Sequence, residues 1–228
     1  MTEPTALIVG ASRGLGLGLV RELLGRDWSV IATARDANGS ELAKLARAHP
    51  DRLRVEVLDV NDQAQLGALE TRLRGATLDL LFVNAGITER AELADVSQQA
   101  FTAIMLTNAL SPVQIALALR DRMHPGGTIA FMSSRMGSIA EMDVGNSAVY
   151  RASKAALNAL TRCFVAEVGA GKFTVLSFHP GWVRTDMGGP NAAVSIEDSV
   201  RGIADVLERE RGSGQHKFLD YQGNAIPW

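Results

Sequence analysis

Tyr150 and Lys154 are the residues of this chain whose types and spacing most directly indicate chemistry. They stand four positions apart at the head of an alanine- and leucine-rich run. Because positions i and i+4 share one face of a helix, a phenol and an ammonium at this spacing can point into the same cleft. A nearby cation favours the ionised phenol, so Lys154 is expected to lower the pKa of Tyr150 from its usual value of ~10. The pair predicts a tyrosine general acid or base, although an exposed helical pair has the same spacing.

A glycine-rich segment follows the first apolar run of the chain. Residues 5–9 have the composition of a short strand, and Gly10, Gly14 and Gly16 come next, before an amphipathic run that begins at Leu17. Glycines let a loop approach a pyrophosphate, whose charge suits the free N–H groups of a following helix. The spacing is neither G-x-G-x-x-G nor that of a Walker loop. By itself it therefore favours a nucleotide site and a plain glycine-rich turn equally.

The length and composition of the chain limit the remaining possibilities. With 228 residues, 46% of them hydrophobic and 21% charged, it predicts one α/β domain over residues 1–228. The formal net charge of -2 gives no general attraction to nucleic acid or membrane, so the expected partner is a small molecule. The chain enters its first predicted strand almost at once, and no apolar stretch is expected to be long enough to span a bilayer. These features predict a cytoplasmic protein without a signal peptide.

The cysteine and histidine content argues against disulfide and metal chemistry. Cys163 is the only cysteine, which excludes an internal disulfide, and its apolar neighbours at helical spacing predict that it lies in the core. The four histidines are scattered without the spacing of metal ligands, so no metal site is predicted.

Segments of strand type and helix type alternate along the chain. Strands are predicted near residues 5–9, 28–34, 53–58, 78–83, 127–132, 173–178 and 217–220, and helices near 14–26, 39–48, 62–74, 98–123, 148–169 and 196–210. This alternation predicts a doubly wound, seven-stranded parallel sheet with helices on both faces, which binds ligands at the carboxyl ends of its strands.

Polar residues and glycines follow six of these predicted strand ends. They are Gly10, Arg35, Asp59 with Val60, Asn84-Ala85-Gly86, Ser133-Ser134 and His179-Pro180-Gly181. The chain resembles the short-chain dehydrogenase/reductase family over nearly its whole length. The matching residues are the glycine loop, Asp59-Val60, Asn84-Ala85-Gly86, Asn108, Ser134, the Tyr150 and Lys154 pair, and Pro180-Gly181 with Thr185. Residues 180–192 and the ending Pro227-Trp228 look most like the small carbonyl reductases called sniffer and C-factor. Val9 and Val83 depart from the family, which commonly has polar residues there.

The resemblance implies a Rossmann fold and reversible hydride transfer between a nicotinamide cofactor and a carbonyl or secondary alcohol. It implies that Tyr150 is the general acid and that Ser134 hydrogen-bonds the same substrate oxygen. Ser133 is the main rival for the serine role, and either serine could be only a turn former. Lys154 would lower the pKa of Tyr150 and bind the nicotinamide ribose.

Asn108 completes the catalytic set that the resemblance implies. Pro112 lacks the N–H that would bond the Asn108 carbonyl, so this carbonyl is expected to be free to hold a water that links Lys154 to solvent. A helix kink of purely structural meaning is the alternative. His179 matches a variable family position and is expected to make a structural contact.

The implied cofactor contacts come from the same strand ends. They are Gly10, Gly14 and Gly16 at the pyrophosphate, Asp59 and Val60 at the adenine, Asn84, Ala85 and Gly86 at the ribose, and Thr185 at the carboxamide, together with Ser12, Arg13, Leu15, Arg35, Tyr150, Lys154, Pro180, Gly181 and Val183. Asp59 could instead cap the helix near Asp62, and Asn84-Ala85-Gly86 could be only a turn.

The end of the second predicted strand indicates which cofactor is preferred. An NAD-specific site usually places an acidic residue there, whereas this chain has Ala34 and then Arg35. Arg13 can approach the same corner, and two guanidinium groups suit a 2′-phosphate. NADP(H) is therefore predicted in preference to NAD. The nearby acidic residue Asp36 is the one feature against this prediction, because it could turn toward the ribose.

The substrate side and the assembly are less constrained. Met136, Ile139, Met142, Trp182 and Met187 are expected to wall the pocket, with residues 182–195 as a lid, which favours a hydrophobic aldehyde or ketone. The family usually forms homodimers or homotetramers through helices corresponding to 98–123 and 148–169. A cofactor-binding regulator of the C-factor type, with little turnover, is the alternative function.

Overall fold

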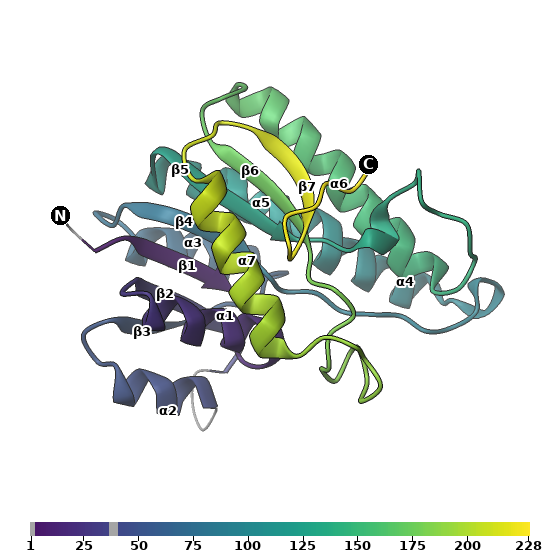
Figure 1. Cartoon of the computed structure of the whole chain (residues 1–228), viewed down its shortest axis with the longest axis horizontal. Helices are drawn as coiled ribbons and strands as arrows, with labels where there is room; N and C mark the ends of the chain where they lie inside the picture. Colours follow the sequence, from purple (N-terminus) through teal and green to yellow (C-terminus); the bar gives the residue numbers. More distant parts are fainter. Residues whose placement is uncertain (1–2, 37–40) are drawn as a thin grey trace.

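The seven strands lie side by side in the order β3-β2-β1-β4-β5-β6-β7, and every pairing is parallel (Figure 1). The computed structural model describes residues 3–36 and 41–228. The strands are β1 (Thr5–Val9), β2 (Ser29–Ala34), β3 (Leu53–Val57), β4 (Leu78–Val83), β5 (Met123–Met132), β6 (Thr174–His179) and β7 (His216–Asp220). This sheet confirms the predicted doubly wound fold of Rossmann type.

Helices cover both faces of the sheet (Figure 1). One face carries α1 (Gly14–Gly25), α2 (Glu41–Ala48) and α7 (Ile196–Glu210), and the other carries α3 (Gln63–Arg72), α5 (Ser111–Leu119) and α6 (Ala148–Val168). Along β1, Ala6 and Ile8 pack into the first core and Leu7 and Val9 into the second. A strand buried on both faces is apolar at nearly every position, which explains the apolar run over residues 6–9.

The crevice that positions the site follows from the strand order. From β1 the chain moves outward through β2 to β3, and then returns to the other side of β1 with β4. The loops after β1 and β4 therefore leave the sheet on opposite faces. This reversal opens a crevice at the carboxyl ends of the strands, where doubly wound sheets bind their ligands.

The long helix predicted over 98–123 is one continuous run with a change of winding inside it. It comprises α4 (Gln98–Met105), a π-helical turn η2 (Leu106–Leu110), α5 and a short 3-10 turn η3 (Arg120–Arg122). The Ser111 N–H bonds the Leu106 carbonyl, five positions back. Pro112 has no N–H to donate to the preceding turn, and the wider winding falls directly before it.

Other predicted boundaries need smaller corrections. Strand β5 begins at Met123 rather than 127, and its pairing with β4 shifts register between Leu78 and Leu80. The predicted helix start near 39 lies outside the described residues. The remaining elements agree with the prediction to within two residues at each end.

Two predictions about individual segments are wrong. Cys163 is exposed, because Leu157 and Phe164 take the buried face of α6 and leave Cys163 on the outer face. The run Gln98–Arg122 is long and apolar enough, by length and composition, to cross a bilayer. More than half of its most apolar window is buried inside the protein, where α5 packs in the second core, so this apolarity is that of a core helix.

Candidate active site

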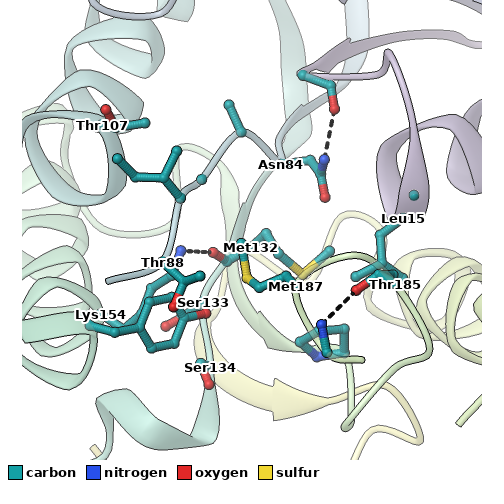
Figure 2. Close-up of a pocket in the computed structure, with 18 of the residues that line it drawn as sticks. Leu15, Asn84, Thr88, Thr107, Met132, Ser133, Ser134, Lys154, Thr185 and Met187 are labelled. Carbon is teal, nitrogen blue, oxygen red and sulfur yellow. Dashed lines mark hydrogen bonds between the residues drawn. The ribbon is translucent and has the colours of Figure 1, made fainter. Parts of the chain in front are cut away.

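A cleft of about 1120 Å³ opens at the carboxyl ends of the strands. Most of the predicted site residues line it: Gly10, Ser12, Arg13, Gly14, Leu15, Arg35, Asp59, Val60, Asn84, Ala85, Gly86, Ser134, Met136, Tyr150, Lys154, Pro180, Gly181, Trp182, Val183, Thr185 and Met187. Gly16, Asn108, Ile139 and Met142 do not. Figure 2 shows Ser134 and Lys154 on one side of the cleft and Leu15 and Thr185 on the other, with Met187 between them.

The glycine loop is held against the loop after β4. The Asn84 side-chain N–H donates to the Gly10 carbonyl at 2.7 Å (Figure 2), and the Ala85 N–H donates to the Val9 carbonyl at 3.1 Å. Gly10 has φ +84, and a Cβ there would lie 2.8 Å from Ala85. A Cβ on Gly16 would overlap the Gly10 carbonyl and lie 2.7 Å from Asn84 Nδ2. Glycine is required at both positions because the two backbones are in contact.

Two arginines, one in the glycine loop and one after β2, line the cleft. Arg35 follows directly after β2 and is exposed, and Arg13 lies inside the glycine loop; both line the cleft. The Arg13 guanidinium forms an ion pair with Asp186, at 2.5 Å between Nη1 and Oδ2. Asp186 stands in the segment that passes over the cleft, so this pair joins the two walls.

The loop after β3 distinguishes the roles of its two aspartates. Asp62 caps α3, accepting hydrogen bonds from the N–H groups of Ala64 and Gln65. Asp59 accepts instead from the Asn61 N–H and lines the cleft, so it is not the helix cap.

Asn61 lines the cleft as well, although it was not among the predicted site residues. Its amide bonds the hydroxyls of Thr107 and Ser111 at 2.9 and 2.8 Å, which ties this loop to the π-helical turn.

The structure separates the two candidate serines. The Ser133 hydroxyl is buried and uses its hydrogen on the Asn158 side chain, to which it donates at 2.7 Å. The Ser134 hydroxyl accepts from the Met136 N–H at 3.2 Å and lies beside the Tyr150 phenol, whose pKa it lowers. Ser134 is therefore the serine whose hydroxyl lies next to the Tyr150 phenol.

Burial acts on both members of the tyrosine and lysine pair. The Lys154 ammonium lies 5.8 Å from the centre of the Tyr150 ring and donates to the Met132 carbonyl at 2.8 Å (Figure 2). Burial raises the pKa of Tyr150 to about 12, against the opposing effect of Ser134, and lowers the pKa of Lys154 to about 8. The expectation that Lys154 brings the pKa of Tyr150 toward neutrality is wrong for this state, because desolvation disfavours both charged forms.

Asn108 is fully buried behind the cleft wall, where it joins two of its elements. Its amide accepts from the Ile87 N–H and donates to the Ile87 carbonyl, both at 2.8 Å, and also donates to the Ser153 hydroxyl at 3.0 Å. Asn108 thus fixes the backbone after Gly86 relative to the helix that carries Tyr150. The water that was expected at its carbonyl remains a prediction.

The substrate side differs from the apolar pocket that was expected. Ile139 is 71% exposed and Met142 is 40% exposed, and neither lines the cleft, although Glu141 and Asp143 of the same loop do. Charged residues that the sequence did not single out line this side of the cleft: Arg90, Arg135, Glu141, Asp143 and Arg151. Their positions depend on how long loops fold back, and no spacing in the sequence indicates that.

His179 lines the cleft at the end of β6. Its Nδ1 is buried and has no hydrogen-bond partner among the described residues, so the predicted structural contact is not formed through that atom. Burial and Arg135 lower its pKa to about 4, against the opposing effect of Asp220.

The fold and the cleft are those of a nucleotide-binding oxidoreductase with a tyrosine and lysine pair. Residues 4–194 match the family described as short chain dehydrogenase, and the chain belongs to that family. C-signal of Myxococcus xanthus is 36% identical over 164 residues, which cover 71% of this chain and 99% of C-signal.

Two solved structures resemble the whole molecule. A short-chain dehydrogenase/reductase of Burkholderia multivorans with bound NADP superposes with a TM-score of 0.96 at 44% identity, over 100% of both chains. The carbonyl reductase Sniffer of Drosophila melanogaster superposes with a TM-score of 0.88 at 30% identity, again over 100% of both chains. Together with the C-signal match, these findings confirm the resemblance to sniffer-like and C-factor-like proteins.

Proposed function

We propose that this protein is an NADP(H)-dependent carbonyl reductase that reduces a small aldehyde or ketone, or oxidises the matching secondary alcohol. The observation that carries the proposal is the convergence of Ser134, Tyr150 and Lys154 on a cleft whose opposite wall is the glycine loop. The NADP-bound relative of Burkholderia multivorans and the carbonyl reductase Sniffer support the same cofactor and reaction class.

The residues present fit a dinucleotide. Gly10 and Gly16 keep side chains out of the contact between the loops after β1 and β4, which places N–H groups of the α1 N-terminus along the cleft. Arg13 and Arg35 supply positive charge at the outer corner, where a 2′-phosphate would take charge-assisted hydrogen bonds. Asp59 and Val60 would contact the adenine, and Thr185, beside Pro180, Gly181 and Val183, the carboxamide.

The reacting groups suit reduction at neutral pH. When bound, NADPH would supply the hydride. Tyr150 stays protonated because its pKa is about 12, so its phenol can give a proton to the substrate oxygen as negative charge builds there. Ser134 receives one hydrogen bond from the Met136 N–H and keeps its own hydrogen to donate to the same oxygen.

Lys154 stabilises the phenolate that this proton transfer leaves behind. Its pKa of about 8 keeps it mainly cationic at neutral pH, and its bond to the Met132 carbonyl fixes the ammonium near the ring. Asn108 fixes the position of the backbone after Gly86 relative to the helix that carries Tyr150. The Asn108 carbonyl and a water bound to it would return the proton through Lys154.

The assembly and setting follow the same reasoning. We infer a soluble cytoplasmic enzyme that pairs into a homodimer or homotetramer through α4–α5 and α6, where Phe101 and Leu110 are exposed. The C-signal match also favours a second candidate, a cofactor-binding signalling protein with little turnover.

The test is NADPH oxidation across a panel of aldehydes, ketones and quinones. Tyr150→Phe should lower kcat by a factor on the order of 10² to 10⁴ and leave the Kd for NADPH nearly unchanged. Tyr221→Phe is the matched control, because Tyr221 is the only other tyrosine and lies outside the cleft. Tight NADPH binding without turnover of any carbonyl compound would favour the signalling protein. More than half of the native rate in Tyr150→Phe would remove Tyr150 from its role.

Cofactor preference has its own test. The wild-type protein should favour NADPH over NADH by at least about tenfold in kcat/KM, and Arg35→Ala should reduce that ratio, since each charged bond to the phosphate is worth about 1.5 to 3 kcal/mol. Equal use of the two cofactors by the wild type would show that Arg13 and Arg35 do not discriminate NADPH from NADH through its 2′-phosphate.

A further inference from the structure

The segment over the cleft, residues 182–194, is braced by its own hydrogen bonds. Val183 and Val194 form a β-bridge at its base, and the Trp182 indole N–H donates to the Gly188 carbonyl at 2.8 Å. The Arg184 guanidinium donates to the Ala192 and Ala193 carbonyls, both at 3.0 Å. Because these bonds are internal, the segment can change its position on the cleft without losing its own fold. We refer to residues 182–194 as the lid; Ser195, the last residue of the predicted lid, caps α7 instead.

Two arginine side chains join the lid to the opposite wall. Arg13 of the glycine loop bonds Asp186 at 2.5 Å, and Arg90, after β4, donates to the Met187 carbonyl at 2.9 Å. The two ties differ in kind. Arg90 bonds a backbone carbonyl, whereas Arg13 bonds a carboxylate, the one acidic side chain in the lid.

Arg13 is also one of the two arginines that would bind a 2′-phosphate. Its guanidinium is 75% exposed at the cleft mouth, and the Asp186 side chain is 78% exposed. A carboxylate and a phosphate oxygen seek the same donor geometry on a guanidinium. Asp186 therefore accepts a hydrogen bond from the Arg13 guanidinium, and an entering phosphate would compete for the same N–H group.

We propose that Asp186 is a specificity-determining residue. Without cofactor, its carboxylate binds Arg13 at the place that the cofactor 2′-phosphate would take. When NADP(H) binds, its 2′-phosphate displaces the Asp186 carboxylate from Arg13. The proposal rests on the NADP(H) binding proposed above. This displacement breaks the ion pair between Arg13 and the lid and leaves the hydrogen bond from Arg90 to the Met187 carbonyl in place. NADH has no 2′-phosphate, so it binds without this displacement.

The expected effect is modest and selective. Exposed ion pairs are weak, because solvent and salt screen them, so removing Asp186 as a competitor should tighten phosphate binding by only about two- to fivefold. The gain should appear for every ligand that carries the 2′-phosphate, should be absent for NADH, and should shrink as salt is added.

The experiment measures Kd by calorimetry for NADPH, NADH and adenosine 2′,5′-bisphosphate, in the wild type, Asp186→Asn, Arg13→Ala and the double variant. Asp186→Asn should tighten NADPH and the bisphosphate and leave NADH unchanged. In the Arg13→Ala background, Asp186→Asn should have no effect. Asp27→Asn is the matched control: it removes the same charge from an exposed pair with Arg52, at the amino-terminal edge of β2 and β3.

Two results would overturn the proposal. An equal gain for NADH would show that Asp186 acts on the pyrophosphate that both cofactors share, and an unchanged or weaker NADPH Kd would show that no competition exists. Either result leaves the proposed function standing if the wild type still prefers NADPH. A wild-type protein that binds no NADPH would instead contradict the proposed function itself.

Discussion

The two halves of the cleft are built in different ways. In the cofactor half, short loops leave adjacent strands and are tied by backbone groups, as in the bonds from Asn84 to the Gly10 carbonyl and from the Gly10 N–H to Thr33. In the substrate half, residues 138–147 and the lid carry large exposed side chains such as Ile139 and Trp182. The cofactor half is therefore determined by backbone sterics, and the substrate half by which side chains the loops present.

The largest test of this difference is Gly16→Ala. The added Cβ would overlap the Gly10 carbonyl and press on Asn84, so the glycine loop must move. A shift of about 1 Å in a positioned group costs on the order of 10²-fold, and we expect the NADPH Kd to rise by that factor. Overpacking should also lower the free energy of unfolding by about 1 to 3 kcal/mol.

Gly67→Ala is the matched control, since Gly67 lies in α3 with open space around its Cβ position. It should stabilise the protein by about 0.5 to 1 kcal/mol and leave NADPH binding unchanged. Normal NADPH binding by Gly16→Ala would show that the cofactor half tolerates backbone movement and that the division between the halves is wrong.

The second test is Asn108→Ala, at the junction of the halves. The change leaves the Ile87 N–H and carbonyl and the Ser153 hydroxyl without their buried partner. Each unsatisfied group costs about 1 to 3 kcal/mol, so we expect the free energy of unfolding, measured with urea, to fall by on the order of 3 kcal/mol. Ser153→Ala removes one of the three bonds and should cost about 1 kcal/mol. A similar cost for both variants would mean that Asn108 does not couple the two walls.

Much of the cofactor half could be predicted from the sequence, for a physical reason. A parallel strand buried on both faces is a nearly continuous apolar run, as in residues 6–9, and the ligand-binding residues of this fold follow the strand ends. Gly10, Asp59 and Asn84, which follow strand ends, accordingly line the cleft.

The features that were missed depend on contacts distant in sequence. Arg13 meets Asp186 across 173 positions, and no local pattern indicates such a pair. Arg151 lines the cleft because its guanidinium turns back to the Asn146 carbonyl, which depends on how the preceding loop folds. Cys163 was assigned to the wrong helix face because apolar residues precede and follow it in sequence, although Leu157 and Phe164 share a buried face that does not include it. The raised pKa of Tyr150 reflects burial, which the spacing to Lys154 does not reveal.

Acid sensitivity should come from two histidines, His179 at the carboxyl end of β6 and His216 at the start of β7. Burial lowers the pKa of His179 and of His216 to about 4, from ordinary values of 6.5. Between these values the unfolded chain binds protons that the folded protein does not, so stability should be lost as pH falls from about 6.5 toward 4.

Urea unfolding at several pH values measures this loss. His216→Gln should show a shallower fall in the free energy of unfolding than the wild type over the same range. His124→Gln, at an exposed histidine, should follow the wild type. Parallel curves for all three proteins would show that the buried histidines do not control acid stability.

The smallest effect is expected in the substrate half, where two methionines form a matched pair. Met187 is 41% exposed and lines the cleft, whereas Met142 is 40% exposed and lies outside it. Since a few methylene groups of apolar contact are worth about 1 to 2 kcal/mol, Met187→Ala should raise KM for a hydrophobic carbonyl substrate by roughly 5- to 30-fold. Met142→Ala should leave KM within about twofold, and neither change should alter the NADPH Kd. Because exposure and side-chain type are the same, only position relative to the cleft separates the two variants. A larger effect from Met142→Ala would mean that residues 138–147 close over the substrate during turnover. That loop, and not only the lid, would then form the wall that contacts the substrate.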